Sequence, residues 1–243
     1  MLTEAEKIRY NRQIILPGWG EEGQAKLKQA TVFIAGAGGL GSPVAIYLAA
    51  AGVGCLRICD CGEPELSNLN RQILHTDADI GKKKVQSAKE TLAKINPHVE
   101  IVSLPEKIEH ENIAQLIADA QILIDCLDNF ATRYILNELA VKAGLPFIHA
   151  GVYGMSGQLT FIHTPETPCL QCMFPQAPPA ETFPVVGATP GIIGSLEALE
   201  ALKYLIGKEE SCLKHKLLIF EGDIGTFTAI RIEKNPACPV CGK

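Results

Sequence analysis

Residues 33–42 read FIAGAGGLGS, and a second hydrophobic run ends on an acid at residues 58–62, which read ICDCG. A buried strand, a Gly-x-Gly-x-x-Gly turn, a helix and an acid after the next strand are typical of a dinucleotide-binding α/β fold. Gly36 permits a tight turn, Gly38 lets a phosphate approach the backbone, and Gly41 lets the helix pack close to the strand. This stretch therefore predicts a nucleotide site.

The identity of the nucleotide is not decided by this stretch. Amide groups at the start of the helix favour an anion, and Asp60 can accept hydrogen bonds from ribose hydroxyls. Both properties serve NAD and ATP equally well, so the choice depends on residues further along the chain.

Hydrophobic strands alternate with helices over roughly the first 150 residues, which predicts a Rossmann-like, doubly wound, mainly parallel sheet. The predicted strands of this part are residues 30–36, 55–60, 99–105, 121–128 and 146–154. The predicted helices are residues 3–15, 41–53, 82–96, 111–120 and 130–144. A C-terminal antiparallel extension is predicted from three strands without crossover helices of the βαβ kind, at 157–164, 216–223 and 227–234, with one helix at 193–207.

The composition narrows the class of protein. The chain has 243 residues and a formal net charge of −5, without the basic excess that usually accompanies nucleic-acid binding. The first residues are polar, and no apolar run approaches the length of a membrane helix. We therefore expect a cytoplasmic protein that binds neither nucleic acid nor membrane.

Four of the nine cysteines form two Cys-x-x-Cys pairs, Cys169 with Cys172 and Cys238 with Cys241. Two such knuckles can place four thiolates tetrahedrally around Zn²⁺ in a closed structural site. The alternative is a redox dithiol or two unrelated pairs. A thioredoxin-type pair would open a helix, and Pro239 argues against that. We predict a structural zinc site.

Polar and charged residues are predicted at the carboxyl edge of the sheet, where ligands of such folds lie. The stretch SNLNRQ (67–72) places Asn68, Asn70 and Arg71 after the second strand, and Lys84 begins the next helix. Asp128 ends the fourth predicted strand. Several cations beyond the helix amides favour a triphosphate, and an acid among them suggests Mg²⁺, which takes oxygen ligands.

Four stretches and the two cysteine pairs together resemble the ThiF/MoeB/HesA family, relatives of the ubiquitin-activating enzymes. They are RYNRQ (9–13), GAGGLGS (36–42), SNLNRQ (67–72), DCLDN (125–129) and the two cysteine pairs, and the resemblance covers nearly the whole chain. It implies an adenylyltransferase that uses ATP to activate the C-terminal glycine of a small ubiquitin-like sulfur-carrier protein ending in Gly-Gly. It also implies a homodimer and a structural zinc. Thiamin and molybdopterin pathways use such carriers, and these residues select no particular one.

The resemblance also implies roles for individual residues. The expected catalytic residues are Arg71, Asp128, Lys84 and Arg12, of which Arg12 would reach the phosphates from the partner subunit. The expected nucleotide-binding residues are Gly36, Gly38, Gly39, Gly41, Asp60, Ser67, Asn68, Asn70, Arg71, Gln72, Lys84, Asp128 and Asn129. Asp128 would hold the magnesium.

We expect a single adenylation domain spanning residues 1–243. Within it, we expect a helical arm at 1–25, a nucleotide-binding core at 26–155, and a crossing loop, zinc site and carrier-binding part at 156–243.

The chain departs from the family pattern in the Pro- and Gly-rich crossing loop at 172–191. Many relatives carry a cysteine there that can join covalently to the carrier, whereas this chain has Phe183 at the matching position. No cysteine lies between Cys172 and Cys212. We therefore expect a reaction that stops at the acyl-adenylate. Cys212, which we expect to be exposed, is the alternative thiol.

Two other functions remain open from the sequence. The enzyme could adenylate a peptide or another substrate, or the fold could belong to an NAD(P)-dependent oxidoreductase. The cations argue against NAD.

Overall fold

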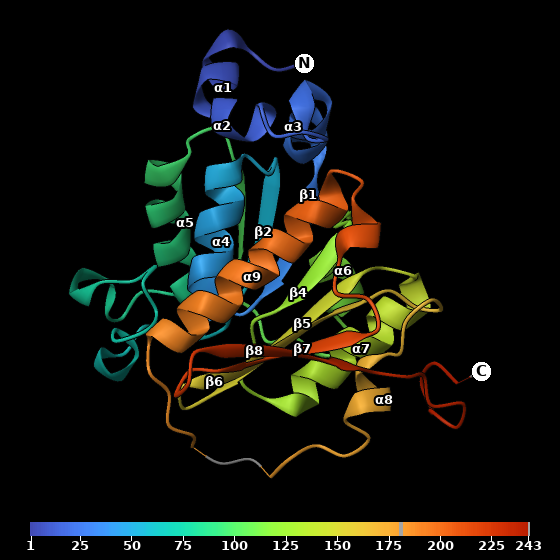
Figure 1. Cartoon of the computed structure of the whole chain (residues 1–243). Coiled ribbons are helices and arrows are strands. Elements are labelled where there is room, and N and C mark those ends of the chain that lie inside the picture. The colour runs from blue at the N-terminus through green and yellow to red at the C-terminus, as the bar shows by residue number, and fades with distance from the viewer. Residues whose placement is uncertain (180–181, 243) are drawn as a thin grey trace.

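The computed structural model describes residues 1–179 and 182–242. In these residues one sheet runs through the molecule with the strand order β3-β2-β1-β4-β5-β6-β7-β8 (Figure 1). The strands are β1 (Thr31–Ala35), β2 (Cys55–Cys59), β3 (Glu100–Leu104), β4 (Ile122–Asp125), β5 (Phe147–Tyr153), β6 (Ser156–Ile162), β7 (Lys216–Glu221) and β8 (Thr226–Arg231).

The pairing of neighbouring strands changes once along the sheet, from parallel to antiparallel at β5. Strands β3 to β5 are parallel, and β5 to β8 are antiparallel. Ala35 at the end of β1 pairs with Cys59 of β2 on one side and with Asp125 of β4 on the other. The segments that follow these three strands therefore leave the sheet side by side. This confirms the predicted parallel sheet with an antiparallel C-terminal extension.

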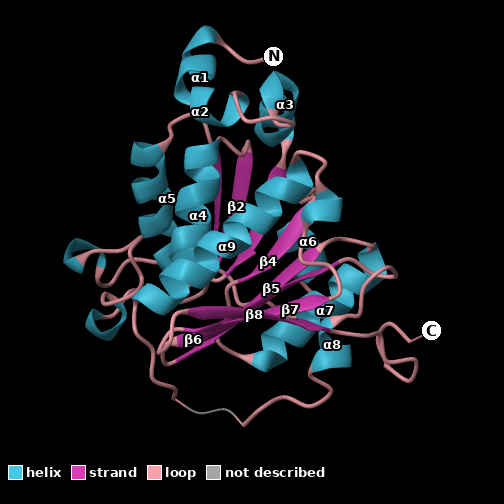
Figure 2. Ribbon diagram, in the orientation of Figure 1, coloured by secondary structure: helices cyan, strands magenta, loops and turns pink. Residues whose placement is uncertain are grey.

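Helices cover both faces of the sheet. Helices α4 (Gly41–Ala51), α5 (Lys84–Ile95) and α9 (Ala188–Leu205) lie in front of it in Figure 2 and enclose one apolar core. A second core lies on the other face, beneath α6 (Ile113–Ile117), α7 (Phe130–Ala143) and α8 (Leu170–Met173). Apolar side chains on both faces explain why the strands read as continuous hydrophobic runs.

A helical arm precedes the sheet. It comprises α1 (Glu4–Arg9), α2 (Asn11–Ile14) and α3 (Gly20–Gln29). A capping box between Thr3 and Glu6 begins α1. The single helix predicted for 3–15 is thus two short ones, and α3 was not predicted.

Other boundaries also differ from the prediction. β4 ends at Asp125, three residues before the predicted end, and α6 is half the predicted length. α9 begins five residues earlier than predicted, because Pro190 fits the first turn of a helix, where its missing N–H costs no hydrogen bond. Among the described residues, no helix combines the length and apolarity needed to cross a membrane.

Candidate active site and metal centre

The glycine turn, residues 36–41, connects β1 to α4. Gly36 has φ +101°, and a Cβ there would lie 2.6 Å from the carbonyl oxygen of Cys126. A Cβ on Gly41 would overlap the carbonyl oxygen of Gly36. Only glycine fits both positions, and α4 therefore begins directly above the end of the strand. The turn follows the carboxyl end of β1, and its Gly36 amide donates to the Cys59 carbonyl at 2.8 Å.

Asp60 fixes the shape of the glycine turn. Its Oδ2 accepts a hydrogen bond from the Ala37 amide at 2.8 Å, and its Oδ1 accepts one from the Gly62 amide at 2.8 Å. Each carboxylate oxygen can accept a further hydrogen bond. Asp60 is therefore both a part of the turn and an available acceptor beside it.

The SNLNRQ loop lies against the same turn. The short helix η1 (Leu66–Asn68) begins it, and the Arg71 guanidinium donates to the Ser67 carbonyl at 3.0 Å and to the Asn70 side chain at 2.9 Å. The stem of Arg71 lies against Gly39, where a Cβ would be 3.5 Å from Arg71 Cγ. Gln72 is buried and lies beside Gly38. The structure thus brings these predicted residues together.

Lys84 is the first residue of α5 and is half-buried. A Cβ added to Gly62 would lie 3.6 Å from Lys84 Nζ and 3.1 Å from Asp60 Oδ1, so the ammonium group lies in the neighbourhood of the Asp60 carboxylate. Within the described residues Lys84 has no carboxylate within ion-pair distance, unlike its neighbours Lys82 and Lys83. This leaves a positive charge at the sheet edge that an anion can use.

Asp128 lies three residues beyond the end of β4 and is exposed. Its carboxylate receives only a long contact, 3.5 Å from the Asn129 amide nitrogen, and forms no ion pair with a described residue. The Asn129 oxygen caps α7 by accepting from the Thr132 amide at 3.0 Å. The free carboxylate suits a hard cation such as Mg²⁺, whereas Asn129 has a structural role as well.

Arg12 is not brought to this edge. It is exposed on α2, in an arm that contacts the other end of the sheet. Gln13 donates to the carbonyl of Ala51, the last residue of α4, at 3.1 Å, and Arg9 donates to the carbonyl of Ile95, the last residue of α5, at 3.2 Å. The glycine turn lies at the opposite end of α4, so Arg12 of the same chain is remote from it.

A buried polar network beneath Asp128 was missed by the sequence analysis. The Asp125 carboxylate is fully buried and accepts hydrogen bonds from His149 Nδ1 at 2.7 Å and from the Arg133 guanidinium. Arg133 also donates to the carbonyls of Leu127 and Ala150. Burial opposes ionisation of Asp125, but Arg133 and His149 outweigh it and lower its pKa. The network holds the turn that presents Asp128.

Contacts with neighbouring segments hold residues 183–187, in the second half of the crossing loop. The Phe183 ring stacks on Tyr153 with centroids 6.4 Å apart, the Gly154 amide donates to the Pro184 carbonyl, and the Val186 amide donates to the Gly154 carbonyl. Gly187 lies so close to the backbone of Asn70 that a Cβ would overlap its carbonyl oxygen. The loop therefore contacts both the β5–β6 turn and the SNLNRQ loop.

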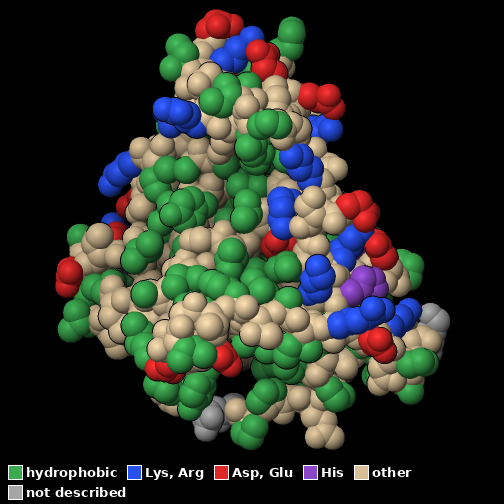
Figure 3. Space-filling model, in the orientation of Figure 1, with side chains coloured by type: hydrophobic (Ala, Val, Ile, Leu, Met, Phe, Trp, Pro, Cys, Tyr) green, Lys and Arg blue, Asp and Glu red, His purple; other side chains and the backbone are tan. Residues whose placement is uncertain are grey.

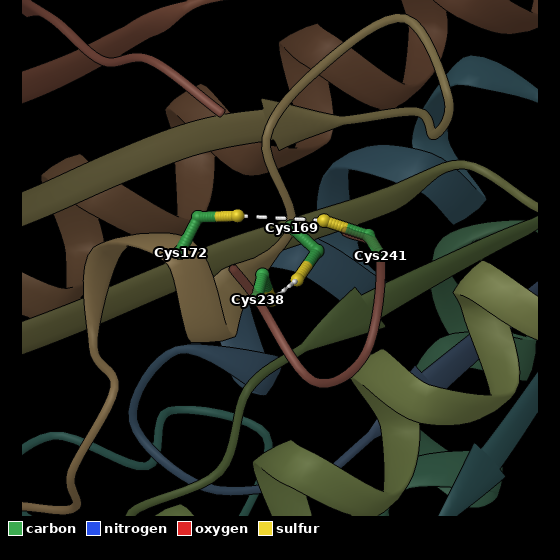
Figure 4. A group of neighbouring side chains, drawn as sticks. All are labelled: Cys169, Cys172, Cys238 and Cys241. Atoms are coloured by element: carbon green, nitrogen blue, oxygen red, sulfur yellow. Dashed lines mark hydrogen bonds between the residues drawn. The ribbon is translucent and has the colours of Figure 1, made fainter. Parts of the chain in front are cut away.

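The four paired cysteines form one cluster, the cysteine cluster, shown in Figure 4. Their sulfur atoms all lie within 4.8 Å of one another, with 3.6 Å between Cys169 and Cys238 and 3.4 Å between Cys172 and Cys241. Tetrahedral zinc with Zn–S bonds of about 2.3 Å requires sulfur–sulfur distances near 3.8 Å, whereas a disulfide requires about 2 Å. The Asn235 amide also donates to the Cys172 sulfur at 3.4 Å. The cluster fits a metal ion.

The Cys212 thiol is less accessible than its position in the sequence suggested. Cys212 is buried, and its thiol faces the Glu200 carbonyl, so the prediction that it is exposed is wrong. A short helix after α9, η3 (Glu209–Ser211), turns the chain back and places Cys212 in the core. Burial raises its pKa to about 12, which leaves almost no thiolate at neutral pH.

The family model, the relatives in sequence and the solved structures that match this chain all indicate the same family. Residues 10–240 match the ThiF family. The sulfur carrier protein adenylyltransferase of Thermus thermophilus is 40% identical, over 99% of this chain and 92% of that protein. The SAMP-activating enzyme E1 of Haloferax volcanii is 39% identical, over 100% of this chain and 91% of that protein. The crystal structure of E. coli MccB with ATP has a TM-score of 0.85 and 25% identity, over 99% of this chain and 75% of that one.

Proposed function

The chain belongs to the ThiF family and is an adenylyltransferase of that family, and we propose that it activates a small ubiquitin-like sulfur-carrier protein. The carrier would end in Gly-Gly, and its terminal carboxylate would be converted to an acyl-adenylate with release of pyrophosphate. One observation carries the proposal. The glycine turn, Arg71, Lys84 and Asp128 come together at one edge of the sheet, in a chain similar over its full length to enzymes named for carrier activation.

The proposed reaction needs charge stabilisation more than a protein nucleophile. An oxygen of the glycine carboxylate attacks the α-phosphorus of ATP, a new P–O bond forms, and the bond to the β-phosphate bridging oxygen breaks. Negative charge then grows on the phosphate oxygens. Arg71 and Lys84 would stabilise this charge, and the amides of the glycine turn would bind phosphate oxygens. Asp60 would accept from the ribose hydroxyls, and Ser67, Asn68 and Asn129 would complete the pocket.

Two metals have proposed places. Asp128 would hold Mg²⁺, which would neutralise charge on the phosphates. The cysteine cluster would hold a structural Zn²⁺, because four thiolates form a closed tetrahedral site with no position for substrate.

We also propose a homodimer in which Arg12 reaches the phosphates of its partner. The remoteness of Arg12 from the glycine turn of its own chain supports supply from the partner. Figure 3 shows apolar side chains gathered on the face of α4, α9 and β8, and Tyr47 of α4, Leu199 of α9 and Phe227 of β8 are exposed. A large exposed apolar surface marks an interaction site. Residues 156–243 would receive the carrier.

The experiment that tests the proposed function is carrier-dependent exchange between ATP and labelled pyrophosphate. We expect exchange with a small protein ending in Gly-Gly and none when the terminal glycines are removed. Arg71→Ala should reduce the rate at least about 100-fold, because it removes a charge made available to the transition state. Arg57→Ala is the control, because Arg57 is also half-buried but lies on β2. Near-normal exchange in the Arg71→Ala variant would show that Arg71 has no role in the reaction. Thermal stabilisation of the protein by NAD but not by ATP would overturn the proposed function.

Mixing variants tests whether Arg12 acts across a dimer. Arg12→Ala and Asp128→Ala should each retain little activity alone. In a mixed dimer, one of the two sites combines an intact Asp128 with an intact Arg12. Because random pairing makes about half of the dimers mixed, refolding the two variants together should restore about a quarter of the activity. Arg9→Ala, in the same arm, is the control. No recovery in demonstrated mixed dimers would exclude action in trans.

We further propose that the reaction ends at the acyl-adenylate. Phe183 provides no thiol in the crossing loop, and Cys212 is buried with a raised pKa. Mass spectrometry after incubation with carrier and ATP should detect no reducible adduct on this chain. An adduct on any cysteine would contradict the proposal.

A further inference from the structure

The segment 72–75 lies between the glycine turn and α5. On the turn side, the Leu74 amide donates to the Ser42 hydroxyl at 3.3 Å, and that hydroxyl donates to the Gly38 carbonyl at 2.7 Å. On the helix side, the Thr91 hydroxyl donates to the Leu74 carbonyl at 2.9 Å. The segment thus joins two elements to which phosphate binding is assigned above.

His75 makes the most direct connection in this segment. Its imidazole is 4% exposed, with Nε2 2.9 Å from the Ala37 carbonyl oxygen and Nδ1 2.9 Å from the Ser87 hydroxyl. The Ala37 oxygen can only accept, so Nε2 carries the proton. Burial lowers the pKa of His75, so the ring is neutral at neutral pH and Nδ1 accepts from Ser87.

Both ends of the Ala37 peptide unit are therefore held. Its amide donates to Asp60, and its carbonyl accepts from His75. Ser87 lies one helical turn after Lys84, and residues three apart share a helix face. A single imidazole consequently connects the backbone of the glycine turn with the helix that carries Lys84.

We propose that His75 is a positioning residue for ATP, fixing the glycine turn and the start of α5 at the spacing that a triphosphate requires. This inference rests on the proposed function. Removing the imidazole would leave the buried Ala37 carbonyl without its partner and let the turn and the helix move independently. The expected loss is in binding of the nucleotide, because the tether contacts no reacting atom.

Three variants separate the tether from general packing. His75→Phe keeps a buried ring and removes both hydrogen bonds. His75→Gln keeps a donor at the ε position that can reach the Ala37 carbonyl. Thr91→Val removes the hydrogen bond that holds the same segment to α5 but leaves the glycine turn untouched.

Pyrophosphate exchange provides the first measurement. We expect His75→Phe to raise KM for ATP about tenfold with kcat little changed, since the lost hydrogen bond to the Ala37 carbonyl of the glycine turn corresponds to roughly that factor. His75→Gln should recover most of the loss, and Thr91→Val should match the wild type. Equal KM values in all variants, or a Gln variant as defective as the Phe variant, would overturn the inference.

Hydrogen exchange in the ATP-free protein provides the second measurement, which does not depend on the reaction. Amides of residues 33–42 should exchange faster in His75→Phe than in wild type or Thr91→Val. Unchanged exchange would overturn the tether even if the enzyme is active. Absence of pyrophosphate exchange in the wild type would instead overturn the proposed function. If His75→Phe does not fold, Ser87→Ala replaces it in both measurements, with a smaller effect in the same direction.

Discussion

The carboxyl edge around the glycine turn and the cysteine cluster are built by opposite means. The edge is assembled from segments that follow β1, β2 and β4, so the register of the sheet brings its residues together before any ligand binds. The cysteine cluster joins two pairs 69 residues apart in sequence, with hydrogen bonds and packing that involve few other residues. Its thiolates repel one another unless a cation lies between them.

The difference shows where the free energy of each region comes from. Buried groups hold the backbone around Lys84 and Asp128 in place, so both side chains are positioned before a ligand binds. In the cysteine cluster, the first pair is supported by α8, whose Leu170 amide donates to the buried Asn137 side chain at 2.8 Å, and metal binding would order the C-terminal pair. Loss of the ligand should therefore leave the first region intact and loosen the second.

The largest effect should follow from disruption of the proposed zinc site. Cys241→Ser should reduce bound zinc from about one ion per chain to almost none, removing a binding free energy that reaches about 10–16 kcal/mol in small zinc domains. Residues 232–242 should then become sensitive to protease, whereas the affinity for ATP should stay within about twofold. Elemental analysis, limited proteolysis and calorimetry measure these quantities. A strong loss of ATP affinity would show that the two regions are coupled.

The next effect concerns the support beneath Asp128. Arg133→Met leaves the fully buried Asp125 carboxylate without its cationic partner and should cost about 3–5 kcal/mol of unfolding free energy. Chemical denaturation measures the loss. Arg133→Met combined with Asp125→Asn should recover part of it, because the uncompensated charge is then gone. Zinc content should not change in either variant, and a parallel loss of zinc would contradict the separation of the regions.

A smaller effect, confined to activity, is expected at the edge itself. Asp128→Ala should reduce pyrophosphate exchange about 100-fold, equivalent to about 2.7 kcal/mol. Its melting temperature should equal that of the wild type, because the side chain is exposed and forms no ion pair with a described residue. Glu65→Ala, an exposed acid of the SNLNRQ region, is the control. A matched fall in stability would mean that Asp128 supports the fold.

The smallest effect is a dependence of stability on pH. Burial lowers the pKa of His149 and of His75, so both rings are neutral when folded and take up a proton more readily when unfolded. Stability should be complete above the ordinary histidine pKa and fall as the pH drops below it. Each imidazole should cost about 1 kcal/mol between pH 7 and pH 5.5. A variant with both histidines changed to Gln should show a flatter profile, and an unchanged slope would contradict this account.

The sequence predicted the parts of both regions that depend on local patterns. The glycine turn, Asp60 and the cysteine pairs follow fixed spacings, and their chemistry restricts the residues that can occupy them. The strands of the parallel sheet were recognised because they are buried on both faces. The predicted fold class was confirmed for this reason.

The buried hydrogen bonds of Asp125 and His75 could not be predicted from local sequence patterns. Asp125 and His149 are 24 residues apart, and His75 and Ala37 are 38 apart, with no period that announces a contact. Each of these residues also has ordinary roles at a strand end or in a loop. Cys212 was misplaced for a related reason, because only the three-dimensional path of η3 shows that it turns inwards.

The contact between Gly187 and the backbone of Asn70 has a consequence for the order of events. The crossing loop and the segment that carries Arg71 touch directly, with no side chain between them to absorb movement. A carrier tail that lifts the loop would therefore disturb the arginine, and a nucleotide that fixes the arginine would resist the lifting. Binding of the two substrates would then be mutually dependent, and the reactive mixed anhydride would stay sheltered from hydrolysis until the loop is released.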